Sequence, residues 1–582
     1  MPSIERFLAM TVGWGAMMGS PASIEAINSR LRRYGLGRVL RELSRLNIAL
    51  EHRSPRHEDG SLEDQQDFVL AGLVGPEHTA ALRRHATERL KDPTPSPDRL
   101  VFIHERQVLT AMKMALLCIG ADAPADERTD MEPLLEALLM INDIIDARFE
   151  NLDTLTPDGR EQFAGYEFAL AQFHARTITV SERPRAFHQF VEIPSGILKQ
   201  SDFDVAAELT RATGLAPFDV FVAIHSIQTL WLAMTEDELI AGEVAMDPDR
   251  FFSTLTALDP AERAKWIALV ATDLADLQAR VRAKYANDLR HFDFLVFEKS
   301  PVVMIDGRLW CLSVPLLSYL GTDGLYHRLC ETRHFTSAQQ QLFRTSHGKL
   351  VEAYAVAGLK RMFGARCIPE ATLKALPSLR NRKVCEAVID CGDSLLLVEV
   401  KASRVPLPAR HADGPAALLQ AWRPPIERAA SQMESLATSV RQDLLAPLGI
   451  SASRILRIYP VLIVTDHVAL PQTRARIEQQ IIAHHPLGTS VARGEVERLI
   501  TLSLPELEHL ESAIDAGHDV VSLLQGLNNM PTHAWMNMSR HLTTLEPPIG
   551  RTPSWHMGEY ERISALVVAR LRALGMPQSG AG

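Results

Sequence analysis

The chain has 582 residues, 46% of them hydrophobic, and a formal net charge of -10, which is typical of a globular protein of roughly two to four domains. The negative balance argues against a uniformly basic protein that coats nucleic acid. No apolar run reaches the roughly 18–20 residues of a membrane span, and residues 7–18 lack a clean cleavage site, so we expect neither a transmembrane helix nor a signal peptide.

The six cysteines show no C-x-x-C pair and no zinc-ligand spacing. This pattern predicts free thiols, which suit a reducing compartment. We therefore expect a cytoplasmic protein without membrane contact.

Residues 1–290 predict a mainly helical region. Apolar residues recur at helical spacing in segments such as 218–234 and 261–286, and Pro217 and Pro260 stand at suitable helix starts. No catalytic constellation occurs here. A helical region without chemistry of its own suits target sensing, homo-oligomerisation or binding of a partner protein, and we expect one of these roles.

Residues 291–527 predict an α/β domain, because short apolar runs now alternate with helical patterns. Runs at 292–297, 302–305 and 309–314 indicate strands, the last two joined by a hairpin turn at Asp306-Gly307. The further elements expected in chain order are a helix at 349–362, a hairpin at 384–401, a helix at 425–446, and strands at 455–465 and 499–502.

Two local signals refine the end of this domain. Pro460 cannot donate a ladder hydrogen bond, so we expect its strand to lie at a sheet edge or to begin at Val461. Ser503 and Glu506 have the spacing of a capping box and predict a helix start. Residues 528–582 follow as an extension of helices and loops.

The hairpin at 384–401 carries the strongest functional signal, because it ends in Glu399-Val400-Lys401 on a strand otherwise made of Leu and Val. Strand side chains alternate, so Glu399 and Lys401 share one face, and buried charges there must be paired or bind a metal. The chain has 11 lysines against 50 arginines, and this is its single acid-x-Lys triplet. The scarcity favours a role that needs lysine's compact charge. The alternative is a strand with a lysine at its solvated tip.

The hairpin register selects a second acid. A turn at Gly392-Asp393 places Glu386 opposite Glu399, about 5 Å away between Cβ atoms. Two carboxylates at that distance repel unless a divalent cation lies between them. Asp390 is four residues nearer the turn, about 13 Å from Glu399 at ~3.3 Å per residue. We therefore favour Glu386, and Asp390 stays as an alternative because a bulge would shift the register.

An acid, a hairpin and Glu399-Val400-Lys401 together resemble the PD-(D/E)xK nuclease superfamily, over roughly residues 290–525. The resemblance implies the restriction-endonuclease-like fold, a mixed sheet flanked by helices. Members often carry a Glu on the helix before the hairpin, which Glu352 matches, and a Gln on the helix after it, which Gln432 matches. This chain departs from the family where Glu386 replaces the usual Asp and no Pro precedes it.

The resemblance implies metal-dependent hydrolysis of phosphodiester bonds. Glu386, Glu399, Glu352 and the backbone carbonyl of Val400 would bind Mg²⁺ or Mn²⁺, which prefer oxygen ligands. Lys401 would orient the attacking water or stabilise the charge that develops on the phosphate. Glu352 would assist the metal or the water.

A basic island surrounds the hairpin. Residues 341–410 hold 12 Lys and Arg against 6 Asp and Glu, a local net charge of +6 (12 − 6). Such an island suits a nucleic-acid cleft, although a solvated basic face is the alternative. The candidate phosphate contacts are Lys349, Arg380, Arg382, Lys383 and Arg404.

We therefore expect a metal-dependent nuclease that acts on nucleic acid, DNA rather than RNA, with a role in bacterial defence against phage or plasmids by analogy. One alternative is a catalytically inactive relative that binds nucleic acid or serves as a scaffold. The other is an unrelated α/β protein in which Lys401 simply pairs with Glu399 or Glu386.

Overall fold

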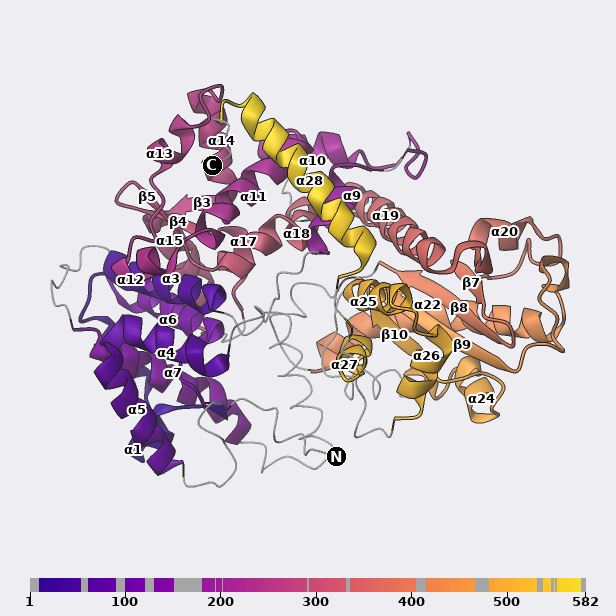
Figure 1. The fold of residues 1–582 in the computed structure, drawn as a ribbon, viewed down its shortest axis with the longest axis horizontal. Coiled ribbons are helices and arrows are strands. Elements are labelled where there is room, and N and C mark those ends of the chain that lie inside the picture. Colours follow the sequence, from indigo (N-terminus) through magenta and orange to yellow (C-terminus); the bar gives the residue numbers. More distant parts are fainter. Residues whose placement is uncertain are drawn as a thin grey trace. The chain divides into compact units, whose positions relative to one another are not determined.

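The computed structural model describes most of the chain, in segments separated by gaps. The described residues are 10–53, 61–90, 100–120, 130–150, 181–193, 195–200, 202–289, 293–330, 335–402, 404, 415–465, 481–530, 537–545, 549 and 552–576. They form two compact units (Figure 1). The N-terminal unit lies within Met1–Thr156, Thr213–Gly324 and Val568–Gly582, and the C-terminal unit within Pro157–Ala212 and Leu325–Val567.

The N-terminal unit is mainly helical, which confirms that part of the prediction. Its helices are α1 (Trp14–Met18), α2 (Ile24–Leu31), α3 (Leu36–His52), α4 (Leu62–Val74), α5 (Pro76–Arg89), α6 (Glu105–Cys118), α7 (Glu132–Glu150), α11 (Pro217–Leu232), α12 (Glu236–Ala241), α13 (Pro248–Ser253), α14 (Pro260–Val270), α15 (Leu274–Tyr285), α16 (Leu295–Lys299) and α17 (Val314–Leu320). Its strands are β1 (Met10–Thr11), β2 (Leu100–Val101), β3 (Ala271–Asp273), β4 (Val302–Ile305) and β5 (Arg308–Cys311).

Two expectations for this unit are wrong. The helix expected at 261–286 is two helices, α14 and α15, separated by strand β3. The strand expected at 292–297 is helix α16 over its described part. A short apolar run does not by itself distinguish a strand from a buried helical turn.

The predicted hairpin at Asp306-Gly307 is confirmed. β4 and β5 are antiparallel, and both turn residues have positive φ, 52° and 73°, as a type I′ turn requires. Its sheet, of order β3-β4-β5, belongs to the N-terminal unit, however, and not to the C-terminal domain expected to begin at 291.

The C-terminal unit combines helices with a five-stranded sheet. Its helices are α9 (Glu182–Phe190), α10 (Val205–Thr213), α19 (Ser337–Phe363), α20 (Glu370–Ala375), α22 (Pro415–Arg441), α24 (Pro486–Ala492), α25 (Leu504–Asp515), α26 (Val520–Asn528) and α27 (Met538–Thr543). Three of the described helices extend across the boundary between the units, namely α10, whose last residue Thr213 belongs to the N-terminal unit, α18 (Asp323–Cys330) and α28 (Ser554–Ala573). The strands are β6 (Cys367–Pro369), β7 (Ala387–Asp390), β8 (Ser394–Lys401), β9 (Arg457–Val464) and β10 (Ile500–Ser503).

The boundaries expected at 290/291 and 527/528 do not coincide with these units. Helix α9, far upstream in the sequence, packs on α19 and belongs to the C-terminal unit. Residues 293–324 belong to the N-terminal unit instead. Periodicity identifies an amphipathic element but not the element against which it packs, so the sequence did not reveal this exchange.

The sheet of the C-terminal unit has the strand order β10-β9-β8-β7-β6. Strands β8, β9 and β10 are parallel to one another, β7 is antiparallel to β8, and β6 is antiparallel to β7. The Ser503–Glu506 capping box is present at the start of α25, directly after β10. The coarse α/β prediction for this region is therefore confirmed.

Pro460 lies inside β9, so the expectation of an edge strand or a start at Val461 is wrong. Strand β9 pairs with β8 along its whole length and with β10 from Val461 onward. Strand β10 begins opposite Val461, one residue after Pro460. On the β10 side of β9, the missing amide hydrogen of Pro460 therefore costs no hydrogen bond of the ladder.

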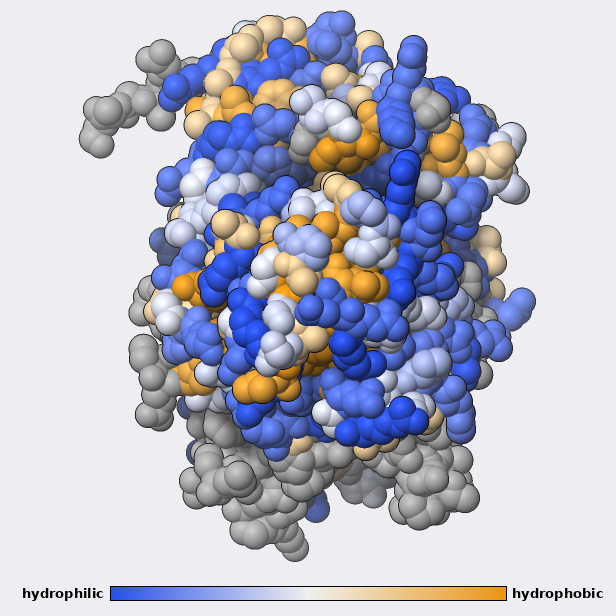
Figure 2. Space-filling model, turned by 90° about the vertical axis from the view of Figure 1, so that its right-hand side faces the viewer, coloured by the Kyte–Doolittle hydropathy of each residue, from blue (hydrophilic) through white to orange (hydrophobic). Residues whose placement is uncertain are grey.

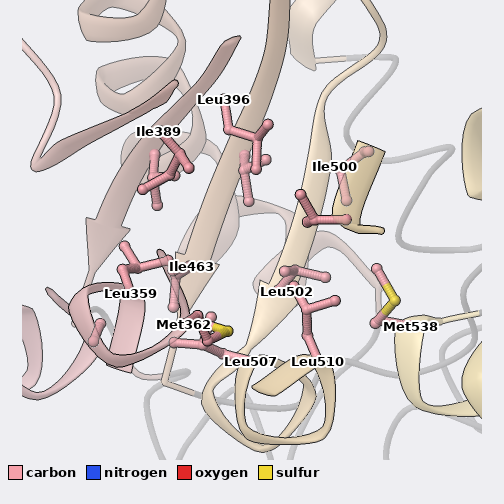
Figure 3. Packing of buried hydrophobic residues seen from close by; sticks show 14 of the residues in the cluster. Leu359, Met362, Ile389, Leu396, Ile463, Ile500, Leu502, Leu507, Leu510 and Met538 are labelled. Carbon is pink, nitrogen blue, oxygen red and sulfur yellow. The ribbon is translucent and has the colours of Figure 1, made fainter. Parts of the chain in front are cut away.

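One face of the sheet is closed by α19 and α25, and the other by α22. Figure 3 shows the first of these interfaces, where aliphatic side chains of the helices and strands interdigitate. The labelled residues there are Leu359, Met362, Ile389, Leu396, Ile463, Ile500, Leu502, Leu507, Leu510 and Met538. Val398 and Val400 also point into this core, so Glu399 and Lys401 point to the opposite face, toward α22.

The end of the molecule that carries α20 and α24 is mainly hydrophilic around a central hydrophobic area (Figure 2). Over the described residues, no single helix has the length and apolar composition needed to cross a membrane. The consecutive helices α10 and α11 pass that test only when the two are taken together.

Candidate metal-binding and catalytic site

The observed register of the β7–β8 hairpin is the predicted one. Val388 pairs with Leu397 and Asp390 with Leu395. The ladder ends at Ala387 and Val398, so the next residues on the two chains are Glu386 and Glu399. Glu386 lies in a bend just before β7 and is half-buried.

Glu399 is a fully buried carboxylate, with 0% of its surface exposed. Its Oε1 accepts a hydrogen bond from the Lys401 ammonium. Its Oε2 has no hydrogen-bond partner among the described residues. A buried charged oxygen without a partner is costly, so this atom marks a position where a further ligand would be stabilised.

Lys401 is held in place by two side chains on this face of the sheet. Besides Glu399, it donates to Oε1 of Gln432 at 2.9 Å. Gln432 in turn donates through Nε2 to the carbonyl of Val384 at 3.2 Å, and this fixes the orientation of its amide. The sequence prediction for Gln432 therefore corresponds to a contact with Lys401, made from α22.

Burial and mutual repulsion make the acids of this site hard to ionise. Burial raises the pKa of Glu386 to about 8, and the nearby carboxylates of Glu352, Glu399 and Glu370 add to the rise. Burial also raises the pKa of Glu399 to about 7, against the opposing effect of Lys401. Carboxylates that repel one another in a partly dry site are stabilised in their ionised form by a divalent cation.

Glu352 approaches the site from α19. Burial raises its pKa, while Lys401 lowers it by attraction and Glu370 raises it further by repulsion. On α19 the adjacent Val351 and Ala355 belong to the apolar core, so Glu352 lies at the margin of the buried stripe. Glu352 therefore interacts electrostatically with Lys401, Glu386 and Glu399, and its role at the site stays a prediction.

Glu370 and Lys374 are site residues that the sequence analysis missed. Glu370 is the first residue of α20, and its backbone amide donates to the carbonyl of Glu386 at 2.8 Å. Lys374 pairs with Glu370 at 2.5 Å, which is the main cause of its raised pKa. In the sequence these two have only the spacing of an ordinary helical ion pair, and the three-residue strand β6 before them carries no pattern.

Asp390 does not belong to the site. It lies at the turn end of β7, where its Oδ2 pairs with Arg454 at 2.7 Å and its Oδ1 accepts from the Gly392 amide at 3.0 Å. Val400 lies two residues beyond the last β7–β8 pair, while β9 still runs alongside it. The role of its carbonyl as a ligand stays a prediction.

The five predicted phosphate contacts occupy different environments. Lys349 pairs with Asp202 at 2.6 Å, and the guanidinium of Arg404 lies over the ring of Tyr326, 4.7 Å from its centroid. Arg382 and Lys383 line a pocket beside the site, whereas Arg380 is exposed outside that lining. Arg382 and Lys383 thus share this pocket with Glu370, and Lys349 is near enough to Glu352 to lower its pKa.

The donor set suits a hard divalent cation. The four carboxylates offer the oxygen ligands that Mg²⁺ and Mn²⁺ prefer, and one of them, Glu399, has an unpartnered buried oxygen. Among the described residues, however, the group of three whose ligand atoms lie within 4.8 Å of one another is a different one, His188, Glu192 and Glu559, and the proposed acids are not brought that close. Arg562 pairs with both of those glutamates and offsets part of their charge.

We compared the chain with known proteins. No protein-family model matches it, and no curated protein matches it.

Proposed function

We propose that the C-terminal unit is a metal-dependent phosphodiesterase of the PD-(D/E)xK type that cleaves nucleic acid. The observation that carries the proposal is the unpartnered Oε2 of buried Glu399 next to Glu386, Glu352 and Lys401. Most buried polar atoms are hydrogen-bonded, so a buried carboxylate oxygen without a partner beside further acids supports a ligand at this position. The mixed five-stranded sheet with a helical layer on each face supports assignment to the restriction-endonuclease-like fold.

Mg²⁺ or Mn²⁺ is the cofactor this site would hold, through Glu386, Glu399, Glu352 and the carbonyl of Val400. When bound, such an ion polarises a phosphoryl oxygen and lowers the pKa of bound water. Glu370 is a fifth candidate, and its ion pair with Lys374 sets how much of its charge is available.

The residues of the chain contribute positioning and charge. Lys401 is held by Glu399 and Gln432, so its ammonium is pre-oriented toward the place where negative charge develops on the phosphate. Gln432 positions Lys401 and does not itself react. Burial raises the pKa of Glu352, which suits it to assist the metal or to accept a proton from the attacking water.

The DNA preference and a role in bacterial defence against phage or plasmids follow from the resemblance and the basic island. The local charge of +6 over residues 341–410 supports binding of a polyanion. The N-terminal unit is proposed to sense the target or to bind a partner, including a second copy of the chain.

A nuclease assay tests the proposal. Wild type, Glu399→Gln and Lys401→Ala are incubated with single-stranded DNA, double-stranded DNA and RNA, with Mg²⁺, with Mn²⁺ and with a chelator. We expect cleavage by wild type that needs the metal and is lost in both variants. Asp390→Asn is the matched control, because it changes an acid of the same hairpin that pairs with Arg454 outside the site.

If wild type and all variants are inactive on every substrate, the proposed nuclease activity is wrong. If wild type then still binds nucleic acid, the inactive nucleic-acid-binding protein is the correct alternative. If it neither cleaves nor binds, the site is a structural pairing of Lys401 with Glu399.

A further inference from the structure

A pocket of about 550 Å³ adjoins the carboxylate site in the C-terminal unit. Its walls come from α20, the segment before β7, and α22. Three lining residues also belong to or contact the site, namely Glu370, Val384 and Gln432. A ligand in this pocket is therefore a direct neighbour of the proposed reaction centre.

The pocket has an excess of positive charge. Its lining holds four cations, Lys374, Arg382, Lys383 and Arg428, and two acids, Glu370 and Glu427. Both acids are already paired, Glu370 with Lys374 at 2.5 Å and Glu427 with Arg423 at 3.5 Å.

Lys383 and Arg428 are the cations available to a ligand. Both are exposed, and neither forms an ion pair with any residue that the structure describes. Arg382, by contrast, donates to the hydroxyl of Ser439 at 3.3 Å.

The described lining of the pocket lacks the means to read bases. None of the described residues that line it is aromatic, so they offer no stacking platform. The side-chain amide among them, that of Gln432, is engaged by Lys401 and by the carbonyl of Val384. Charged contacts without stacking or free amides are those that bind phosphates and carry no sequence information.

Ser431, which also lines the pocket, is not a nucleophile. It lies 3.0 Å from Nε2 of His485, as a serine activated by a histidine would. However, Nδ1 of His485 accepts from the Leu487 amide at 3.1 Å, so the neutral ring carries its proton on Nε2. His485 thus donates to Ser431 and cannot take its proton.

We propose that this pocket holds the backbone of a single nucleic-acid strand next to the scissile phosphate, with phosphates on Lys383 and Arg428 and without base selection. The proposal rests on the nuclease function proposed above. A volume of about 550 Å³ is in the range of sites for single small ligands, which accommodates one or two nucleotides and not a duplex.

Equilibrium binding without metal tests this assignment. The full chain is titrated against two labelled single strands of equal length and different base sequence, and against a blunt duplex, over a series of salt concentrations. The double variant Lys383→Ala/Arg428→Ala is compared with wild type. The control is Lys360→Ala, an exposed lysine on α19, which packs on the other face of the sheet.

We expect the double variant to lose about tenfold in affinity for both single strands. The slope of log affinity against log salt should fall by about 1.4, since each phosphate contact on a single strand contributes about 0.7. Binding of the blunt duplex should change little, and the control should match wild type throughout.

Each of the other outcomes would contradict one part of the proposal. Unchanged affinity excludes the pocket, and a loss confined to one base sequence shows that it reads bases. An equal loss on the duplex excludes a single-strand site. Cleavage of the same strands by wild type in Mg²⁺ separates the two proposals. If wild type cleaves and the double variant binds as wild type does, the strand-binding role of the pocket is wrong and the nuclease function stands. If wild type neither cleaves nor binds, the nuclease function is wrong as well.

Discussion

Each unit holds a lysine in a polar cluster, buried in the case of Lys113 and half-buried in the case of Lys401, and the two differ in how their carboxylate partners are satisfied. In the N-terminal unit, Lys113 is 0% exposed and donates to the carbonyl of Asp293 at 2.8 Å. The rings of Tyr285 and Phe294 lie 4.6 and 4.7 Å from its nitrogen. The carboxylate of Asp293 is itself held by the Tyr285 hydroxyl at 2.6 Å and by Lys284 at 2.9 Å.

Lys401 in the C-terminal unit also pairs with a carboxylate, but the hydrogen bonds of that carboxylate are incomplete. Its carboxylate partner, Glu399, keeps one oxygen without a hydrogen bond, and further acids crowd around it. The comparison teaches that a buried lysine is not by itself a functional sign, even in a chain with 11 lysines. Asp293 Oδ2 also lacks a hydrogen bond among the described residues, but it lies 2.8 Å from the Lys284 ammonium. The Lys401 cluster differs in its excess of acids, since several further carboxylates act on Glu399 and Glu386. We call the Lys113 cluster closed and the Lys401 cluster open.

Lys113→Ala tests the closed cluster and should have the largest effect on stability. It removes a buried charged hydrogen bond and two ring contacts and leaves a cavity, so we expect a loss of about 3–5 kcal/mol in the free energy of unfolding. Denaturant unfolding of the full chain measures it. The rate of phosphodiester cleavage by the protein that remains folded should be unchanged. A loss of cleavage in that folded protein would contradict the assignment of Lys113 to stability and of Lys401 to catalysis.

Lys401→Ala tests the open cluster and should act on rate instead. Loss of a pre-oriented charge that stabilises a transition state costs about 10²–10³ in turnover, or roughly 2.7–4 kcal/mol. We expect this loss in metal-dependent cleavage, with a smaller change in unfolding than Lys113→Ala produces. Lys401→Arg should restore little, because a planar guanidinium does not replace a compact ammonium between Glu399 and Gln432.

Divalent metal should stabilise the open cluster, and more so at higher pH. The pKa values of Glu386 and Glu399, about 8 and 7, are raised above the ordinary 4.5, so between pH 4.5 and 8 the folded chain binds more protons than the unfolded chain. Stability without metal therefore falls as the pH rises through that window. Mg²⁺ at about 100 times its Kd should add about 2.7 kcal/mol at pH 8 and less at pH 6.

Calorimetry with Mg²⁺ and with a chelator at the two pH values measures this effect. Glu399→Gln should abolish the metal-dependent shift, and Asp390→Asn should retain it. A shift that is the same at pH 6 and pH 8 would argue against ligands with raised pKa values.

The sequence predicted the hairpin and its register because both depend on local rules. The turn and the alternation of strand faces were sufficient to select Glu386 over the more conspicuous Asp390, and the ladder has that register. Gln432 was chosen on a weak pattern, yet it contacts Lys401 at 2.9 Å.

The residues that the sequence missed are those placed by long-range packing. Glu370 reaches the site because the short strand β6 pairs with β7, and three residues are too few to show a period. Lys349 was expected at phosphates but pairs with Asp202, from a segment 147 residues upstream. No local pattern shows that residues 202–212 fold with the C-terminal unit.

A buried histidine of the C-terminal unit, His556, gives the smallest predicted effect. His556 is 0% exposed, and burial, with help from Arg361 and Arg185, lowers its pKa to about 3. The unfolded chain takes up this proton near pH 6.5 and the folded chain does not, so stability falls as the pH drops below 6.5. At pH 5 the loss should be about 2 kcal/mol, at about 1.4 kcal/mol per pH unit.

The variant His556→Gln should be less stable at pH 8 but should lose less stability between pH 8 and pH 5 than wild type, as followed by urea unfolding. His484→Gln, at an exposed position of the same unit, is the control and should keep the wild-type slope. This slope separates the buried histidine from the open cluster, because acid weakens the fold when the neutral His556 is forced to take up a charge. The open cluster around Glu399 should instead be relieved by acid in the absence of metal, since protonation removes the repulsion between its carboxylates.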